Sequence, residues 1–247
     1  MRYLFFVGLF GFLSLSVTAQ TITVRNSINP DAPIARDSLA LIEGENFSSE
    51  ERFDPSNAPK TLGGVTVMID GILQRIRRVS QTQVEIIVSG AGKASRALEL
   101  RTESNVIHRT SITVASAWPA LFVQNNSIES ESFYPAGFYT TDGITLSSIT
   151  SAPIPVGPPG RRTQVIIQVT GLRRGAGIKG ISVRLNGIQC NVVLVGKSIL
   201  AGQNELAFEI PFYLAGNGVM DLIITVDGRS SNLGRLNLGD AAGLIGK

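Results

Sequence analysis

The sequence predicts an all-β protein made of two tandem immunoglobulin-like β-sandwiches that follow a signal peptide. Three observations predict this fold class. Short runs alternate apolar and polar residues, no long window shows helical periodicity, and the strand pattern occurs twice along the chain. The 26 glycines and the low charged content of 17% are typical of strands joined by tight turns.

The alternating runs are clearest at residues 65–69, 165–170 and 206–210. Because side chains on a strand point alternately to its two faces, such runs place one face on a core and the other toward water. The residues that we expect to be buried on this basis are Val67, Ile69, Val183, Leu185, Phe208 and Ile224.

The repeat is long. Residues 64–72 match residues 180–188, with Val65 aligned to Ile181 at an offset of 116, and residues 83–88 match residues 203–208 at an offset of 120. The second copy is therefore expected to have a longer loop around residues 196–202. Since solenoid repeats span only about 20–50 residues, this repeat indicates a duplicated domain of about seven strands.

Asp70-Gly71 and Asn186-Gly187 occupy equivalent places in the two copies. Tight hairpins favour type I′ turns, whose two central residues both have positive φ, and Asp-Gly and Asn-Gly readily adopt this conformation. We expect both pairs to close hairpins and to fix their register. A role for Asp70 as a ligand-binding residue is the alternative.

The first residues predict secretion. A basic start at residues 1–3, an apolar run at 4–13, and the small residues Val17 and Ala19 match a signal peptide cleaved before Gln20. A membrane anchor is the alternative, but the run is too short to cross about 30 Å of hydrocarbon. We expect a secreted protein, periplasmic or extracellular, with no membrane span. The predicted segments are a signal peptide at 1–19, a first sandwich at 20–117, an apolar junction at 118–127, a second sandwich at 128–239 and a C-terminal tail at 240–247.

Charge, cysteine and histidine content argue against several functions. The formal net charge of +3 is too small to indicate a nucleic-acid partner. Cys190 is the one cysteine, so no internal disulfide can form; we expect it to pack as a small apolar residue, with an intermolecular disulfide as the alternative. His108, the one histidine, is expected to be an exposed strand residue rather than a base. One residue of each kind cannot supply a zinc site, and no cofactor is predicted.

Acidic residues cluster around Gly44 and between the two copies. They are Glu43, Glu45, Glu50, Glu51, Asp54, Glu129 and Glu131. Carboxylates can bind calcium or act as a glycosidase pair, but the spaced aspartates of a calcium loop are missing from the sequence. We expect a solvated loop, and a calcium site near Glu50 remains the alternative.

The candidate ligand surface combines aromatic and basic residues: Phe133, Tyr134, Phe138, Tyr139, Arg75 and Arg77. The four aromatic residues either pack against the second sandwich, which is the favoured interpretation, or stack on sugar rings. Arg75 and Arg77 share a face of a regular strand and could meet an acidic polysaccharide. For these two and for the doublets Arg161-Arg162 and Arg173-Arg174, protection of edge strands by charge is the favoured alternative.

The junction between the copies is apolar. Residues 115–122 contain too few glycines, serines and charges for a flexible tether. Pro119 fixes its own φ and favours an extended Trp118. We expect Trp118 and Phe122 to bury their rings where the two sandwiches meet, so that the sandwiches are held at a set angle.

Several motifs carry a family resemblance, and they lie at residues 44–47, 62–67, 79–84, 119–122, 142–143, 158–160 and 170–172. In their order and spacing the chain resembles an uncharacterised secreted-domain family common in soil Acidobacteria, which is similar to the immunoglobulin-like, plexin and transcription-factor (IPT/TIG) fold. Glu85 and Thr141 depart from the pattern, since the family more often has Asn at both places. The resemblance implies a fold and secretion, and it implies no activity.

Together, these patterns predict a secreted, non-catalytic module that acts by adhesion, recognition or structural spacing at or outside the cell surface. No Gly-x-Ser-x-Gly elbow or nucleophile–base pair is visible in the sequence, so an enzyme is not expected. The alternative is a carbohydrate-binding protein for extracellular polysaccharide. The partner is thus a protein or a polysaccharide, and the sequence does not distinguish the two.

Overall fold

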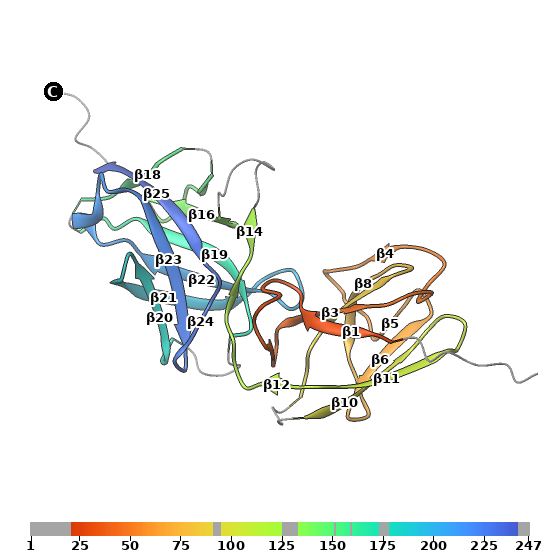
Figure 1. Cartoon of the computed structure of the whole chain (residues 1–247). Coiled ribbons are helices and arrows are strands. Elements are labelled where there is room, and N and C mark those ends of the chain that lie inside the picture. The colour runs from red at the N-terminus through yellow and green to blue at the C-terminus, as the bar shows by residue number, and fades with distance from the viewer. Residues whose placement is uncertain are drawn as a thin grey trace, which may run out of the picture.

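The computed structural model of the chain describes residues 21–90, 95–124, 133–150, 152–158, 160–172 and 178–241. These residues form strands and turns, with one short 3-10 helix at Phe212–Leu214, and the all-β prediction is confirmed (Figure 1). No helix in these ranges is long and apolar enough to cross a membrane. The predicted signal peptide, Glu129, Glu131 and the Arg173-Arg174 doublet lie outside the described residues.

The first sandwich, residues 22–115, packs two sheets against each other. One sheet has the order β1 (Thr23–Asn26), β3 (Leu39–Glu43), β9 (Gln83–Ile87), β8 (Arg75–Val79) and β4 (Arg52–Phe53). The other has the order β11 (Ile107–Ile112), β10 (Arg96–Arg101), β6 (Val65–Ile69) and β5 (Thr61–Leu62), and β7 (Ile72–Leu73) also pairs with β6. A short β2 (Ile34–Ala35) runs parallel to β12 (Val114–Ala115).

The second sandwich, residues 117–241, is formed by one continuous series of hydrogen-bonded strands, which folds over to give two packed layers. Its order is β17 (Ser147–Ser148), β16 (Gly137–Thr140), β19 (Gln164–Thr170), β22 (Asn204–Glu209), β21 (Ile188–Lys197), β20 (Ile181–Leu185), β23 (Gly218–Val226), β25 (Gly234–Ala241) and β18 (Ile154–Val156). The fold-over occurs in β21, because its first part pairs with β20 and its last part with β22. Short pieces complete it: β13 (Ala120–Leu121), β14 (Val123–Gln124), β15 (Tyr134–Pro135) and β24 (Arg229–Ser230).

Strand pairing repeats between the two sandwiches. Leu39 pairs with Ile87 in the first, and Ile166 pairs with Ala207 in the second, which reproduces the offset of 120 read from the sequence for the later strand. In each sandwich an early strand pairs antiparallel in one sheet, β1 with β3 and β16 with β19, and a later short strand pairs parallel with the last strand, β2 with β12 and β18 with β25. This switch of the first strand between two packed sheets is typical of immunoglobulin-like folds.

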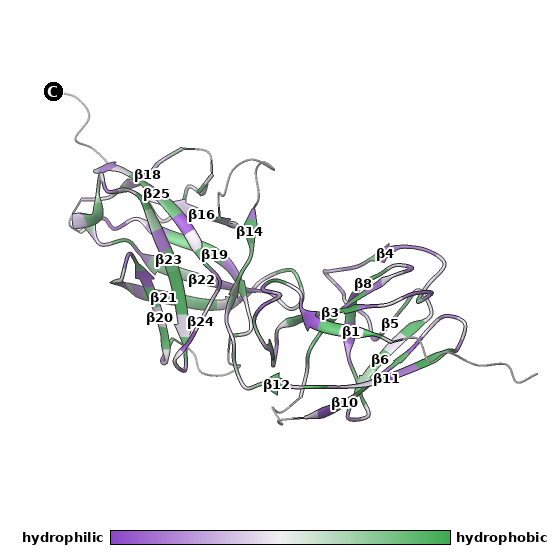
Figure 2. Cartoon of the chain, in the orientation of Figure 1, coloured by the Kyte–Doolittle hydropathy of each residue, from purple (hydrophilic) through white to green (hydrophobic). Residues whose placement is uncertain are grey.

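Each sandwich has its own hydrophobic core. Phe47 is among the largest buried side chains of the first core, and Phe208 has this place in the second. Hydrophobic residues run along the central strands of both sandwiches (Figure 2). The expected burial is confirmed: Val67, Ile69, Val183, Leu185, Phe208 and Ile224 are all 0% exposed.

Both predicted hairpins have the backbone that their sequences require. Asp70 and Gly71 have φ values of 49° and 76°, and Asn186 and Gly187 have 44° and 82°. Positive φ at both central residues is the type I′ signature, so this prediction is confirmed. Asp227-Gly228 between β23 and β24 and Gly63-Gly64 between β5 and β6 are two further hairpin turns with positive φ at both central residues.

Candidate functional site

The two sandwiches meet at the loop of residues 198–203, which joins β21 to β22. In Figure 1 this light-blue loop lies beside the red and orange strands of the first sandwich. The Ala201 N–H donates to the Pro55 carbonyl at 2.8 Å. Ala201 and Phe122 also pack on a small cluster of the first sandwich, formed by Leu39, Ala58 and Ile87. We call these five residues the docking cluster.

Gly202 lets the loop come close to the first sandwich. Its φ is +80°, and a Cβ added there would lie 2.5 Å from Leu39 Cδ2 and 2.9 Å from Ile87 Cγ1. A larger residue would therefore have both a strained backbone and a clash. The sequence predicted a longer loop here but gave no sign of its role.

Two further connections lie beside the loop. The Thr170 hydroxyl lies 2.7 Å from the Gly202 carbonyl oxygen and 3.3 Å from that of Asp37 in the first sandwich. The Trp118 N–H donates to the Gly171 carbonyl at 3.1 Å. The Trp118 ring is half-buried under the Arg229 guanidinium, 5.7 Å from its centre, so Trp118 packs within the second sandwich while Phe122 reaches the first.

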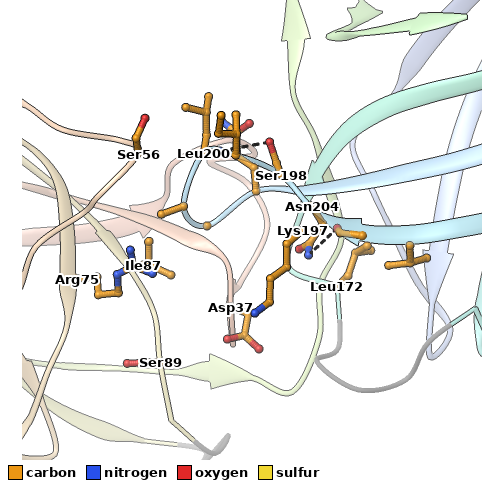
Figure 3. A pocket seen from close by; sticks show the side chains of 16 residues that line it. Asp37, Ser56, Arg75, Ile87, Ser89, Leu172, Lys197, Ser198, Leu200 and Asn204 are labelled. Atoms are coloured by element: carbon orange, nitrogen blue, oxygen red, sulfur yellow. Dashed lines mark hydrogen bonds between the residues drawn. The ribbon is translucent and has the colours of Figure 1, made fainter.

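A pocket of ≈ 580 Å³ opens beside these contacts, between the two sandwiches (Figure 3). The first sandwich contributes Asp37, Arg75 and Ile87 to its lining, and the second contributes Leu172 and Lys197. The Lys197 side chain extends toward the Asp37 carboxylate (Figure 3). The volume falls in the range of small-molecule pockets, about 300–1,000 Å³, and such pockets often lie between domains.

Of the predicted basic pair, Arg75 lines this pocket and Arg77 does not. Arg75 Nε donates to the Ala58 carbonyl at 2.9 Å, and its Nη2 donates to the Asn57 carbonyl. Arg77 is only 5% exposed, its Nη1 lies 3.4 Å from Glu85 Oε2, and burial lowers the pKa of its guanidinium while Glu85 opposes that shift. The strand is irregular between Ile76 and Arg78, so the expectation of regular alternation is wrong here.

The four predicted aromatic residues lie in different environments. Phe133 lies under the Arg235 guanidinium, 5.5 Å from its ring centre, and Tyr134 on β15 pairs with Gln124 on β14. Tyr139 packs against the core of the second sandwich. Phe138 is 47% exposed, while the other three are partly buried, so the four do not form one exposed face.

The acidic residues near Gly44 are held by arginines and backbone. Glu43 accepts from Arg25 Nε at 2.9 Å, and this hydrogen bond lowers the pKa of the Glu43 carboxyl. Glu51 pairs with Arg78 at 2.6 Å, and Glu50 pairs with Arg52. Asp54 accepts from the Asn57 N–H at 3.2 Å. Within the described ranges, no three His, Cys, Asp or Glu side chains are grouped so that they could hold a metal ion.

Cys190 and His108 are both buried. Cys190 is 1% exposed and packs in the second core as expected, and burial raises the pKa of its thiol to about 12. His108 is 5% exposed, and its ring meets the Phe47 ring edge-on at 5.8 Å. The expectation of an exposed His108 is therefore wrong. That expectation rested on the charged residues that flank His108 in the sequence. Alternation along β11 instead turns the His108 ring inward.

No protein-family profile and no curated protein sequence matches the chain. Among solved structures, it is similar to SGBP-B of the Bacteroides ovatus mixed-linkage glucan utilization locus, in complex with a mixed-linkage heptasaccharide, at 10% identity and a TM-score of 0.33. That match covers 84% of this chain and 44% of the other, so the chain spans less than half of that protein.

Two further similar structures are tandem modules. Domains 5–6 of the S-layer protein SbsC match at 12% identity and a TM-score of 0.26, over 89% of this chain and 97% of the other. An immunoglobulin tandem of titin matches at 8% identity and a TM-score of 0.23, over 90% and 97%. The immunoglobulin-like assignment itself rests on the strand order and pairing described above.

Proposed function

We propose that this chain is a secreted, non-catalytic module that acts as a semi-rigid spacer or presenting unit at or outside the cell surface. In this proposal residues 20–117 and 128–239 are its two domains, and residues 118–127 are the junction, of which Ala120–Leu121 pairs with β19 of the second sandwich and Phe122 contacts the first. Secretion and membership of the Acidobacteria-type, IPT/TIG-like family belong to the same proposal, and the signal-peptide pattern and the repeated motifs of the sequence support them.

The observation that carries the proposal is the docked loop of residues 198–203. A flexible tether would leave the two sandwiches without shared contacts, whereas here Ala201 and Phe122 complete the docking cluster on the first sandwich. The hydrogen bond from Ala201 to Pro55 contributes about 1 kcal/mol to this contact, and the apolar side chains of the docking cluster contribute burial in addition.

Small-angle scattering of the whole protein tests this proposal. We expect the wild type to fit a single arrangement of two sandwiches. Gly202→Val should broaden the distance distribution, because the added side chain meets Leu39 and Ile87. Gly228→Val is the matched control: Gly228 has φ +77° against +80° for Gly202, but a Cβ there meets nothing within 4 Å. The proposal fails if the wild type already scatters as two freely tumbling bodies, or if the two variants behave alike.

A carbohydrate-binding protein is the alternative. The aromatic set from which the sequence predicted it is split in the structure, since Phe138 is the one exposed member of the four. Those four residues together with Arg75 and Arg77 therefore give this alternative less support than the docked loop gives a spacer. Phe138 itself lies on the sheet of the second sandwich, where it pairs with Ile166 of β19.

A further inference from the structure

An apolar row crosses the outer face of the sheet formed by β16, β19, β22 and β21. Phe138 pairs with Ile166, Ile166 with Ala207, and Ala207 with Leu194. Directly paired residues of neighbouring strands have their side chains on the same face. The residues next to them in sequence are in the second core, among them Val165, Ile167, Leu206, Phe208 and Val195. The four paired residues therefore face away from the core, and we call them the apolar row.

The two ends of the apolar row are open to solvent. Phe138 is 47% exposed and Leu194 is 51% exposed. Ile166 is partly buried, and Ala207 is 3% exposed because it is small and lies between larger neighbours. Four strands at a spacing of about 4.8 Å make the row roughly 14 Å long and one side chain wide. The exposed apolar surface of the row is therefore concentrated at Phe138 and Leu194.

Polar residues border the apolar row on both sides. On one side Gln168 pairs with Glu205, and Gln168 Nε2 donates to Glu205 Oε1 at 3.4 Å. On the other side Gln164 pairs with Glu209, whose carboxylate accepts from Arg162 at 2.6 Å and from Asn191 at 3.0 Å. Each border thus places a carboxylate beside the row, and each carboxylate already accepts from an amide of the same face.

The shape and charge of this face distinguish between three classes of ligand: a protein, an acidic polymer and a neutral sugar chain. A stable protein partner needs an apolar centre within about 800 Å² on each side, far wider than one row of side chains. An acidic polymer would meet Glu205 and Glu209, and the one arginine in these borders, Arg162, is already paired with Glu209. A neutral sugar chain fits better. A β-linked pyranose has flat C–H faces and hydroxyl groups at its edges, which match an apolar centre with donors and acceptors on both sides.

We propose that this face binds a neutral β-linked polysaccharide whose chain lies across the strands along the apolar row. Phe138 stacks on one sugar ring, Ile166 and Leu194 contact the C–H faces of its neighbours, and the bordering amides and carboxylates hydrogen-bond the hydroxyls. The site lies on the second sandwich alone, so it does not depend on the docked loop.

Affinity electrophoresis of the full chain tests the proposal, in gels that contain either hydroxyethylcellulose, a neutral β-glucan, or polygalacturonate, an acidic polymer. We expect retardation by hydroxyethylcellulose only. Phe138→Ala should weaken binding at least tenfold, and Leu194→Gln should weaken it severalfold. Val219→Ala is the matched control, because Val219 is 54% exposed but belongs to β23 on the other sheet. Circular-dichroism melting identifies any variant that fails to fold. If Phe138→Ala fails to fold, the binding of Leu194→Gln decides the test.

Four outcomes would overturn the proposal. They are a wild type that hydroxyethylcellulose does not retard, retardation by polygalacturonate alone, unchanged binding in folded variants of the apolar row, and a wild-type dimer that Phe138→Ala dissociates. The last would assign the row to a second copy of the chain. None of these outcomes bears on the scattering test, so the two proposals fail separately.

Discussion

The two sandwiches share the order of their central strands, and one of the loops in which they differ makes the contact between them. In the first, residues 80–82 join β8 to β9, and the turn is closed locally by bonds between Ser80 and Gln83 at 2.8 and 3.0 Å. In the second, residues 198–203 join the equivalent strands and contact the first sandwich. A surface loop can lengthen at little cost in stability, so a small insertion in one copy of a duplicated fold is enough to create a contact between the copies.

The two hairpins show a second difference. The Asp70 N–H donates to the Ala97 carbonyl, and Asp70 Oδ1 accepts from the Ala97 N–H. Asn186 makes the same two bonds with Asp221, at 2.8 and 2.7 Å. The residues just before these partners differ. Arg96 in the first copy is buried and donates to Asp70 at 2.9 Å, whereas the second copy has a buried Met220. One turn is thus supported by an ion pair and the other by apolar packing.

The largest expected effect tests whether the two cores are independent. Phe47→Ala and Phe208→Ala each remove a fully buried ring, which should lower the free energy of unfolding by about 3–5 kcal/mol. Because the cores are separate, each variant should destabilise one sandwich. Hydrogen exchange resolved along the chain measures this, with Val219→Ala as a surface control. Equal loss of protection in both sandwiches would contradict the comparison and indicate a single folding unit.

The next largest effect is expected when the Asp70–Arg96 ion pair of the first hairpin is replaced by the residues of the second. Asp70→Asn leaves Arg96, whose side chain is 3% exposed, without its carboxylate and should cost about 3 kcal/mol. The double variant Asp70→Asn/Arg96→Met copies the second sandwich and should cost less than about 1 kcal/mol, since apolar residues often replace a buried ion pair without loss. Urea denaturation measures both. If the double variant is as unstable as the single one, the two hairpins are not interchangeable.

The fold was predictable because its signals are local. Alternation identified the strands, and Asp70-Gly71 and Asn186-Gly187 identified two turns, since their backbone conformation depends on two adjacent residues. The offsets in the repeat located the longer loop. The Arg75–Arg77 face was not predictable, because the irregular pairing between Ile76 and Arg78 depends on how β8 meets β9 rather than on the residues of β8 alone.

The candidate site was less predictable because it depends on long-range pairing. Phe138 was chosen from its aromatic neighbours in the sequence, yet its neighbours on the sheet are Ile166, Ala207 and Leu194, which are far away along the chain. Trp118 and Phe122 were both expected at the contact between the sandwiches; Phe122 makes that contact, but the Trp118 ring lies under Arg229. The alignment of the two copies would have found the apolar row only if strand register had been known.

A smaller effect concerns equivalent positions on β3 and β19. Glu43 in the first copy aligns with Thr170 in the second, whose hydroxyl lies within hydrogen-bond distance of the Gly202 and Asp37 carbonyls. Thr170→Val removes the hydroxyl and should weaken docking by about 1 kcal/mol, roughly fivefold in the population of the docked arrangement. Scattering measured at several temperatures follows this change. A variant that unfolds the second sandwich without opening the contact would show that Thr170 serves the core instead.

The smallest effect is the dependence on pH of the Glu43–Arg25 pair. The hydrogen bond from Arg25 lowers the pKa of the Glu43 carboxyl below its ordinary value of about 4.3. The stabilisation is therefore fully present above pH 4.3 and is lost as the pH falls through the lowered pKa of the folded state. Both side chains are partly exposed, at 34% for Glu43 and 40% for Arg25, so the contribution should stay below about 1 kcal/mol and shrink in high salt.

Glu43→Gln tests this dependence, because glutamine retains the shape of the side chain and a hydrogen-bond acceptor but has no charge to titrate. Compared with the wild type, the variant should be slightly less stable at pH 7 and equally stable near pH 2, because the difference disappears as the pH falls below about 4.3. Urea titrations of both proteins across this range measure the difference. Thr170→Val, at the equivalent position of the second sandwich, is the control, since its difference from the wild type should not change over the same interval. A constant difference between Glu43→Gln and the wild type would mean that the ion pair does not stabilise the first sandwich and that Glu43 acts there through packing alone.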